Sequence, residues 1–243
     1  MSSVLEINHF SKCYAKGKEV CKDINLCVES GDIFGFIGHN GAGKSTTIRS
    51  MVGVLDFERG DILIDGISVK KNPKACKQMI AYIPDNPDIY DHLTGIQYLN
   101  FVSDIFKIPE KQRNELIKQY ADEFEISNSL GDIVASYSHG MKQKLVIVSA
   151  LIHNPKLLVL DEPFVGLDPK AALILKNHMK RLCSDGSAVF FSTHVLDVAQ
   201  KLCNKVAIIK EGRIVACGNI DEIVGDNSLE DVFMEVLLNE NRI

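Results

Sequence analysis

Residues 38–45 form a glycine-rich stretch that ends in a lysine and a serine. They match the pattern G-x-x-x-x-G-K-[ST], follow the apolar segment 33–37 and open a predicted helix. Glycines let such a loop wrap around phosphates with its N–H groups pointing inward, and the helix N-terminus adds partial positive charge. The pattern predicts a phosphate loop in which Lys44 contacts the outer phosphates of a nucleotide and Ser45 holds Mg²⁺. The residues predicted to contact the nucleotide here are Gly38, Asn40, Gly41, Ala42, Gly43, Lys44, Ser45 and Thr46.

Two adjacent carboxylates, Asp161 and Glu162, follow a second apolar segment at 157–160. A strand this apolar is buried, so both acids are expected at the carboxyl edge of the sheet, where open α/β sheets bind ligands. Asp161 is placed to accept Mg²⁺ through water, and Glu162 is placed to polarise an attacking water. Together with the phosphate loop, this pair indicates hydrolysis of a nucleoside triphosphate.

The secondary structure predicted around these residues is mainly strand at first, then helix, and then an alternation of the two. Apolar alternation and turn residues predict strands at 4–10, 21–28, 33–37 and 80–83, with a hairpin around Asp65-Gly66. Three- and four-residue spacing predicts helices at 44–54, 95–106, 110–124 and 139–153. After Pro155 the pattern alternates again, with strands at 157–160, 188–191, 206–209 and 214–216 and helices at 170–183 and 196–202.

Short apolar strands separated by helices indicate a parallel sheet covered on both faces. The predicted fold is α/β, a P-loop NTPase core with a mostly parallel sheet, an N-terminal antiparallel β subdomain and an inserted α-helical subdomain. We expect a single domain over 1–243. Its predicted parts are a core at 1–86 and 155–225, a helical subdomain at 87–154 and a short C-terminal helix at 226–243.

Composition limits the classes of protein to consider. The chain has 243 residues, 46% hydrophobic and 24% charged, which is an ordinary globular balance. Its net charge of −5 argues against a nucleic-acid surface and against direct binding to anionic lipid. The seven cysteines include no CxxC pair, so reduced thiols in a cytosolic protein are expected. Residues 1–10 carry no leader pattern, and no apolar run approaches the roughly 18 residues that cross a bilayer.

A third motif narrows the class. The segment Tyr137-Ser138-His139-Gly140-Met141, followed by Lys142-Gln143, resembles the signature motif of ABC transporter ATPases. The resemblance continues through Pro163, Gly166-Leu167-Asp168 and His194, and covers essentially the whole chain. The form Ser-x-Gly-Met-Lys-Gln looks most like the ATPase subunits of bacterial exporters of peptides, antibiotics or polymers.

The resemblance implies roles for individual residues. Ser138 and Gly140 precede a helix and can offer a hydroxyl, backbone donors and a helix N-terminus to a phosphate. In the family this signature segment faces the phosphate loop of a second ATPase subunit in a head-to-tail dimer, and ATP binds between the two. His194 would bond the γ-phosphate and hold the attacking water with Glu162.

Further nucleotide contacts follow from the same resemblance. Tyr14 would stack on adenine, a contact worth about 1–3 kcal/mol by analogy with nucleic-acid stacking. Val20 is expected to pack on the same base, and Asp168 to lie near the nucleotide. The implied cofactors are ATP and Mg²⁺.

Two departures from the family pattern stand out. Asp85 occupies the position after strand 80–83 where the family has a glutamine, and His139 and Met141 stand where glycine and glutamine are common. A carboxylate 4 Å from a unit charge interacts with it by about 4 kcal/mol at an effective dielectric of 20, and at Asp85 this interaction favours Mg²⁺ and opposes the γ-phosphate. Asn86 could supply a neutral amide instead. His139 adds a titratable group near the partner's ATP.

The predicted function is that of an ATP-hydrolysing subunit that dimerises around MgATP and drives export by a separate transmembrane permease subunit. The second ATPase subunit is either a copy of this chain or a different one. We expect no nucleic-acid partner and no direct membrane insertion, with the chain cytoplasmic and peripheral on the inner face of the membrane. The alternatives are a soluble ABC-type ATPase acting on nucleic acid, ribosomes or iron–sulphur assembly, and a non-hydrolysing regulator. The cargo is left open, because the membrane chain selects it.

Overall fold

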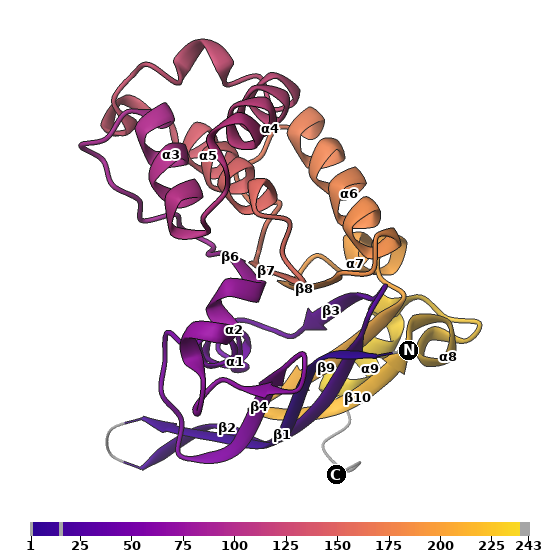
Figure 1. The fold of residues 1–243 in the computed structure, drawn as a ribbon. Coiled ribbons are helices and arrows are strands. Elements are labelled where there is room, and N and C mark those ends of the chain that lie inside the picture. Colours follow the sequence, from indigo (N-terminus) through magenta and orange to yellow (C-terminus); the bar gives the residue numbers. More distant parts are fainter. Residues whose placement is uncertain (1, 15–16, 239–243) are drawn as a thin grey trace.

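The computed structural model describes residues 2–14 and 17–238 and contains two β-sheets of different type (Figure 1). The larger sheet has the strand order β10-β9-β3-β8-β7-β6, parallel throughout except for the antiparallel pair β9–β10. Its strands are β3 (Ile33–Ile37), β6 (Ile80–Ile83), β7 (Leu157–Asp161), β8 (Ala188–Thr193), β9 (Lys205–Lys210) and β10 (Arg213–Asn219). The phosphate loop and the Asp161-Glu162 pair follow β3 and β7, each of which pairs with β8. Both motifs therefore open at one edge of the sheet.

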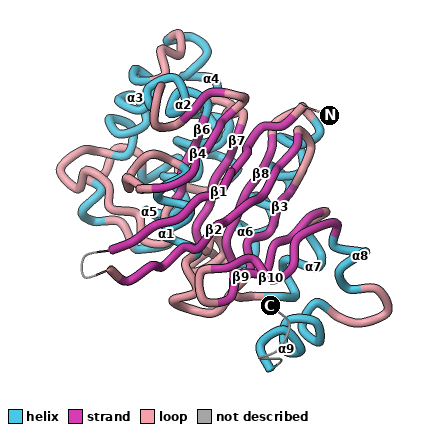
Figure 2. Tube along the Cα trace, turned by 90° about the horizontal axis from the view of Figure 1, so that it is seen from below, coloured by secondary structure: helices cyan, strands magenta, loops and turns pink. Residues whose placement is uncertain are grey.

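The smaller sheet is antiparallel and has the order β2-β1-β4-β5. Its strands are β1 (Ser3–Tyr14), β2 (Lys18–Glu29), β4 (Arg59–Ile64) and β5 (Ile67–Ser68). The β4–β5 turn has positive φ at both Asp65 (50°) and Gly66 (75°), as a two-residue hairpin requires. Figure 2 shows β1, β2 and β4 crossing in front of the larger sheet when the molecule is seen from below.

The strands of the larger sheet contribute alternately to two hydrophobic cores. Ile33 and Ile37 belong to the core that also holds α5, α6 and the helical lobe, whereas Phe34 and Phe36 belong to the core shared with the antiparallel sheet and α1. Phe34 stacks on Phe190 of β8 with ring centroids 5.5 Å apart. Because successive side chains of a strand point to opposite faces, the all-apolar strands are those of a sheet covered on both sides.

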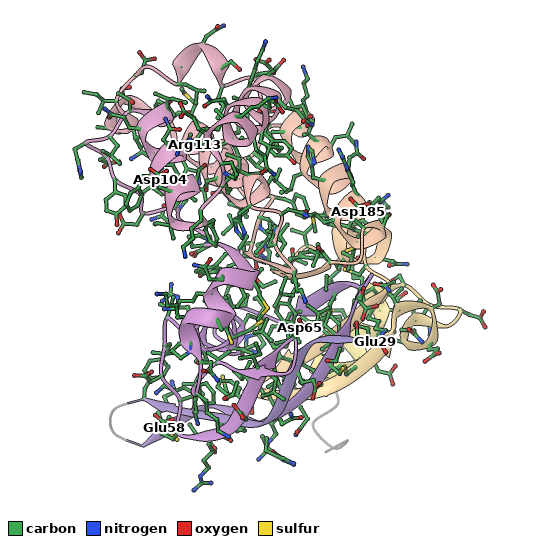
Figure 3. The ribbon with its side chains drawn as sticks, viewed as in Figure 1. Glu29, Glu58, Asp65, Asp104, Arg113 and Asp185 are labelled. Carbon is green, nitrogen blue, oxygen red and sulfur yellow. The ribbon has the colours of Figure 1, made fainter. Side chains whose placement is uncertain are left out.

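Three helices lie together in a lobe next to β6 (Figure 1). They are α3 (Gly95–Ile105), α4 (Glu110–Glu123) and α5 (His139–Ile152). Thr94 starts α3 with a capping box, and Arg113 of α4 points to Asp104 of α3 and donates to its carboxylate (Figure 3). Two further helices, α6 (Pro169–Ser184) and α7 (Leu196–Leu202), connect β7 to β8 and β8 to β9.

Most predicted elements are present, with shifted ends. The helix predicted at 44–54 ends earlier, as α1 (Lys44–Met51), and β1 runs four residues beyond the predicted strand at 4–10. Two short helices were not predicted, α2 (Pro73–Met79) and α8 (Ile220–Val224), because neither has room for a full apolar repeat. The C-terminal helix predicted at 226–243 is α9 (Leu229–Leu238), and residues 239–243 lie outside the described residues.

The fold is the predicted α/β arrangement, with an antiparallel N-terminal sheet, a mostly parallel main sheet and a helical insert. Within the part of the chain that the structure describes, no helix has the length and apolar character needed to cross a membrane. The subdomain boundaries at 86/87, 154/155 and 225/226 stay a prediction.

Candidate nucleotide-hydrolysis site

The phosphate loop connects β3 to α1 and contains glycines at positions where a side chain would collide with neighbouring backbone. A Cβ atom built on Gly38 would lie 2.6 Å from the carbonyl oxygen of Ile209 on β9, a separation that real Cβ atoms do not reach. Gly43 has φ 114°, and a Cβ there would lie 3.1 Å from the carbonyl oxygen of Val20. The loop therefore rests directly on the backbones of β9 and β2, and its shape is fixed before any ligand binds.

A cavity opens above this loop and gathers residues from four segments of the chain. Its lining comprises Val20, His39, Asn40, Gly41, Gly43, Lys44, Ser45, Thr46, Asp85, Asp161 and Glu162. Most of the predicted nucleotide and metal residues are in this set, including Asp85. Of the predicted loop contacts, Gly38 and Ala42 are outside it; Ala42 is buried, and its carbonyl accepts a hydrogen bond from Gly212.

Lys44 places a buried ammonium group at the floor of the cavity. Its side chain is 7% exposed, and Nζ donates to the carbonyl oxygens of Gly38 (2.6 Å) and His39 (3.3 Å). Nζ also lies 3.8 Å from Oε1 of Glu162. Burial lowers the pKa of Lys44, while Glu162 and Asp161 act in the opposite direction. An anionic ligand in the cavity would compensate this buried positive charge better than two carbonyls do.

Asp161 is a buried carboxylate with one oxygen that accepts no hydrogen bond among the described residues. Its Oδ1 accepts a hydrogen bond from Oγ of Ser192, which stands opposite it in the parallel β7–β8 register. Its Oδ2 is buried and has no hydrogen-bond partner among the described residues. Leaving a buried acceptor unpaired costs about 1–3 kcal/mol, and more when it is charged. A cation or its bound water is the natural complement to this oxygen.

Glu162 has a strained backbone beside a histidine. Its φ is +50°, in the left-handed region that non-glycine residues avoid, and its N–H donates to the carbonyl oxygen of Ser192 at 3.2 Å. Nδ1 of His194 lies 2.9 Å from Oε1 of Glu162, although the groups are not aligned as a hydrogen bond. Such strain costs about 1–3 kcal/mol and is concentrated at functional sites. The carboxylate is thereby held at the cavity between Lys44 and His194.

Tyr14 stands at the open side of the cavity. Its hydroxyl is 3.3 Å from Oγ1 of Thr46, and the residue is 43% exposed. Nζ of Lys12 lies 5.8 Å from the centroid of the Tyr14 ring. The exposed ring and the adjacent Val20 offer an apolar surface next to the phosphate loop, which is where a base attached to bound phosphates would extend.

The remaining predicted residues lie outside the cavity of their own chain. Ser138 caps α5 by accepting a hydrogen bond from the N–H of Met141 at 3.3 Å, and Gly140 follows in the first turn. Asp168 caps α6 through the N–H of Ala171 at 2.8 Å. An ion pair with Lys144 holds the pKa of Asp168 below its usual range. None of the three lines the cavity.

Sequence reasoning missed two residues at the site. Ser192 orients Asp161, and its only signal is a hydroxyl on the strand that ends at His194. His39 lines the cavity, although its position in the motif is unconstrained by the pattern.

Comparison with known proteins identifies the family. The family model described as ABC transporter matches residues 21–165. The uncharacterized ABC transporter ATP-binding protein YhcH of Bacillus subtilis is 35% identical over 93% of this chain and 74% of its own length. The ABC-type transporter ATP-binding protein EcsA of the same organism is 32% identical over 96% of both chains. A solved structure described as the ATP binding subunit of an ABC transporter aligns with a TM-score of 0.92 and 33% identity, covering 96% of this chain and 99% of the other.

This chain belongs to the ABC transporter family, as its ATP-binding subunit. It is an ATPase whose hydrolysis serves transport, which decides against the two alternative functions considered from the sequence. Cassettes of this family dimerise and pair with membrane subunits.

Proposed function

We propose that two ATPase subunits close head to tail around two ATP molecules, each held by both chains. Lys44, Ser45 and Asp161 of one chain hold the triphosphate, and Ser138 and Gly140 of the other chain complete the site. The observation that carries this proposal is the separation of Ser138, Gly140 and Asp168 from the cavity that contains Lys44, although all are polar or backbone-donor positions suited to a phosphate. The second subunit is a copy of this chain or a related one.

Hydrolysis within this site is assigned to Glu162 and His194. Glu162 accepts a proton from the attacking water, and its position next to Lys44 holds it at the end of the phosphate chain. His194 approaches from the neighbouring strand and donates a hydrogen bond to the γ-phosphate, which fixes the water between the two side chains. Cleavage of the γ-phosphate removes the group that joins the two chains, so the dimer reopens.

The same site is suited to Mg²⁺. Ser45 and Asp161 would hold it, with Asp85 as a third oxygen donor, and the ion would neutralise charge on the transferring phosphoryl group. The unpaired Oδ2 of Asp161 supports this assignment. Among the described residues, no group of three or more His, Cys, Asp or Glu side chains is arranged to hold a metal ion by itself, so the remaining ligands would be phosphate oxygens and water.

The membrane partner is proposed to dock beside the helical subdomain, near Asp85, at the groove between residues 87–154 and the core. The chain would then act at the cytoplasmic face of the membrane without inserting into it. Export is the proposed direction, supported by the Ser-x-Gly-Met-Lys-Gln form of the signature segment.

The Glu162→Gln variant tests the hydrolytic assignment. It keeps the shape of the side chain and the phosphate contacts but removes the base, so ATP should trap a dimer that gel filtration resolves. Turnover should fall about 10²- to 10⁴-fold. Unchanged turnover would rule out Glu162 as the base. Glu115→Gln, which changes an exposed carboxylate on α4, is the matched control and should behave as the unmodified chain.

Mixing two inactive variants tests the shared sites. Lys44→Ala removes the phosphate loop ammonium, and Ser138→Arg blocks the signature segment. A homodimer of either variant has two defective sites, whereas a mixed dimer has one site that is intact on both sides. Recovered ATPase activity on mixing supports the head-to-tail arrangement, and no recovery alongside normal dimer formation contradicts it.

A further inference from the structure

Two glycines bring the signature segment into contact with the loop before α6. Gly140 lies in the first turn of α5, and Gly166 lies two residues before Asp168. A Cβ atom built on Gly140 would lie 3.0 Å from the carbonyl oxygen of Gly166. A side chain at position 140 would push this carbonyl away, so the two backbones are as close as their chemistry allows.

His139 covers the same glycine from the other side. A Cβ atom built on Gly166 would lie 2.6 Å from Cδ2 and 2.9 Å from Nε2 of His139. The imidazole ring therefore rests against the Cα of Gly166, where any other residue would place a methyl group. Gly166 also has φ +80°, which keeps the loop in a turn that only glycine adopts without strain.

A third contact fixes the end of this loop. Oδ2 of Asp168 is 2.7 Å from Nζ of Lys144, one turn along α5 from Gly140. The other carboxylate oxygen of Asp168, Oδ1, accepts the hydrogen bond that caps α6. Helix α5 thus holds the loop 166–168 at both ends, through the His139 ring at Gly166 and through Lys144 at Asp168.

We propose that His139 is a positioning residue for ATP hydrolysis by the partner's site. Its ring sets the distance between the start of α5 and the loop 166–168. Ser138 and Asp168 therefore keep a fixed relative position when they contact the nucleotide of the partner subunit. This inference rests on the proposed head-to-tail dimer. His139 and Gly166 are exposed in the isolated chain, as surfaces that close on a partner must be.

A double-mutant cycle between His139 and Gly166 tests this assignment. Gly166→Ala puts a methyl group into the space of the imidazole and should lower kcat about tenfold or more, as a displaced positioning group does. In the His139→Gly background the methyl group has room, so the same substitution should lower kcat at least about fivefold less. Equal losses in the two backgrounds would overturn the proposal.

The strain of alanine at positive φ is measured separately. Gly66 has φ +75° in the β4–β5 turn, and a Cβ built there meets no atom within 4 Å. Gly66→Ala therefore reports the strain alone and should change the melting temperature without changing kcat. A loss of kcat in Gly66→Ala would show that strain, and not the contact with His139, accounts for the effect of Gly166→Ala.

Single substitutions of His139 separate positioning from folding. His139→Ala should lower kcat about threefold to tenfold with KM for ATP unchanged, because the phosphate loop that binds ATP is untouched. His139→Gln, which keeps a planar group of similar reach, should restore most of kcat. Wild-type kcat in His139→Ala would refute the proposal.

Two experiments together separate a failure of the proposed dimer from a failure of the positioning role of His139. If the Glu162→Gln chain forms no ATP-dependent dimer, the head-to-tail proposal itself is wrong. If that dimer forms and the His139–Gly166 cycle is additive, only the positioning role is wrong.

Discussion

Nδ1 of His194 and Oε1 of Glu162 are 2.9 Å apart at the ends of two neighbouring strands. The pairing of Asp161 with Ser192 places these strands in register, so the residue that follows β7 and the residue that follows β8 emerge side by side. The two side chains differ in exposure, 15% for Glu162 and 53% for His194. The carboxylate is thus held inside the cavity, whereas the imidazole beside it is about half exposed.

His194→Ala is expected to lower turnover and leave ATP affinity nearly intact. The imidazole would act on the γ-phosphate and on the water held by Glu162, both in the transition state, so kcat should fall about 10²-fold. Steady-state ATPase assays and equilibrium ATP binding measure the two effects. His92→Ala, which removes an exposed histidine of the helical lobe, should leave both unchanged. A rise in KM with constant kcat would instead assign His194 to ground-state binding.

Ser192→Ala should weaken the metal-dependent reaction through Asp161. The substitution removes the hydroxyl that donates to Oδ1 of Asp161 and leaves the carboxylate with no hydrogen-bond donor among the described residues. Such a loss costs about 1–3 kcal/mol, and we expect both a lower free energy of unfolding and a higher Mg²⁺ requirement. Ser103→Ala is the matched control, since Ser103 is a fully buried serine of α3 whose hydroxyl donates to the carbonyl oxygen of Leu99 on the same helix. Equal Mg²⁺ requirements in the two variants would contradict the role of Ser192.

The fold and the centre of the site were predictable because local patterns determine them. The glycines at 38, 41 and 43 occur where the loop must turn and touch β9 and β2, and the run 157–160 is apolar because both faces of β7 are covered. Each of these features depends on residues that are close together in the sequence. Helix α5 likewise begins directly after Ser138, because the hydroxyl of Ser138 caps the first turn of the helix.

Other features depended on pairing between distant segments and were not predictable. Ser192 orients Asp161 only because of the β7–β8 register, and no local pattern marks it. The contact of His139 with Gly166 joins residues 27 positions apart across the start of two helices. Helix α2 also escaped prediction, because seven residues with one buried side chain, Cys76, carry no apolar periodicity.

Asp85→Asn tests the effect of a carboxylate where the family has glutamine. Asp85 lines the cavity with Asp161 and Glu162, so it would add negative charge close to a cation or phosphate bound there. A neutral amide should raise the Mg²⁺ concentration for half-maximal ATPase about tenfold and tighten ATP binding measured without Mg²⁺. Mg²⁺ titrations of ATPase activity and ATP binding in chelator provide the two readouts. Asp91→Asn, in the helical lobe, is the charge-matched control. If neither quantity moves, Asp85 contributes nothing to metal binding.

Tyr14→Ala should lower affinity for ATP but not for inorganic triphosphate. The ring is exposed beside Thr46, so its removal leaves the phosphate loop intact and takes away only the surface for the base. Loss of one stacking contact of about 1–3 kcal/mol corresponds to a roughly 5- to 150-fold weaker ATP Kd. Tyr14→Phe keeps the ring and should bind ATP as the unmodified chain does. Equal weakening of ATP and triphosphate would place Tyr14 at the phosphates.

His153 gives the free energy of unfolding a defined dependence on acid pH. Its ring stacks on Phe106 with centroids 3.7 Å apart, and burial lowers its pKa from 6.5 to about 4. The folded state therefore binds this proton less readily than the unfolded state. The resulting stability is fully present above pH 6.5 and is lost as the pH falls through 4. The contribution amounts to about 3 kcal/mol at most, since one pKa unit corresponds to about 1.4 kcal/mol.

His153→Phe keeps the aromatic stack and removes the titration. Urea unfolding at pH 7.5 should give similar free energies for the variant and the unmodified chain. Below pH 6.5 the variant should become progressively more stable by comparison, because carboxylates and the other histidines titrate alike in both chains and cancel in the difference. His92→Phe, at an exposed position, should show no such divergence. Parallel curves for His153→Phe and the unmodified chain from pH 7.5 to 4 would mean that the His153 ring accepts its proton without leaving the stack, so burial would not control its charge.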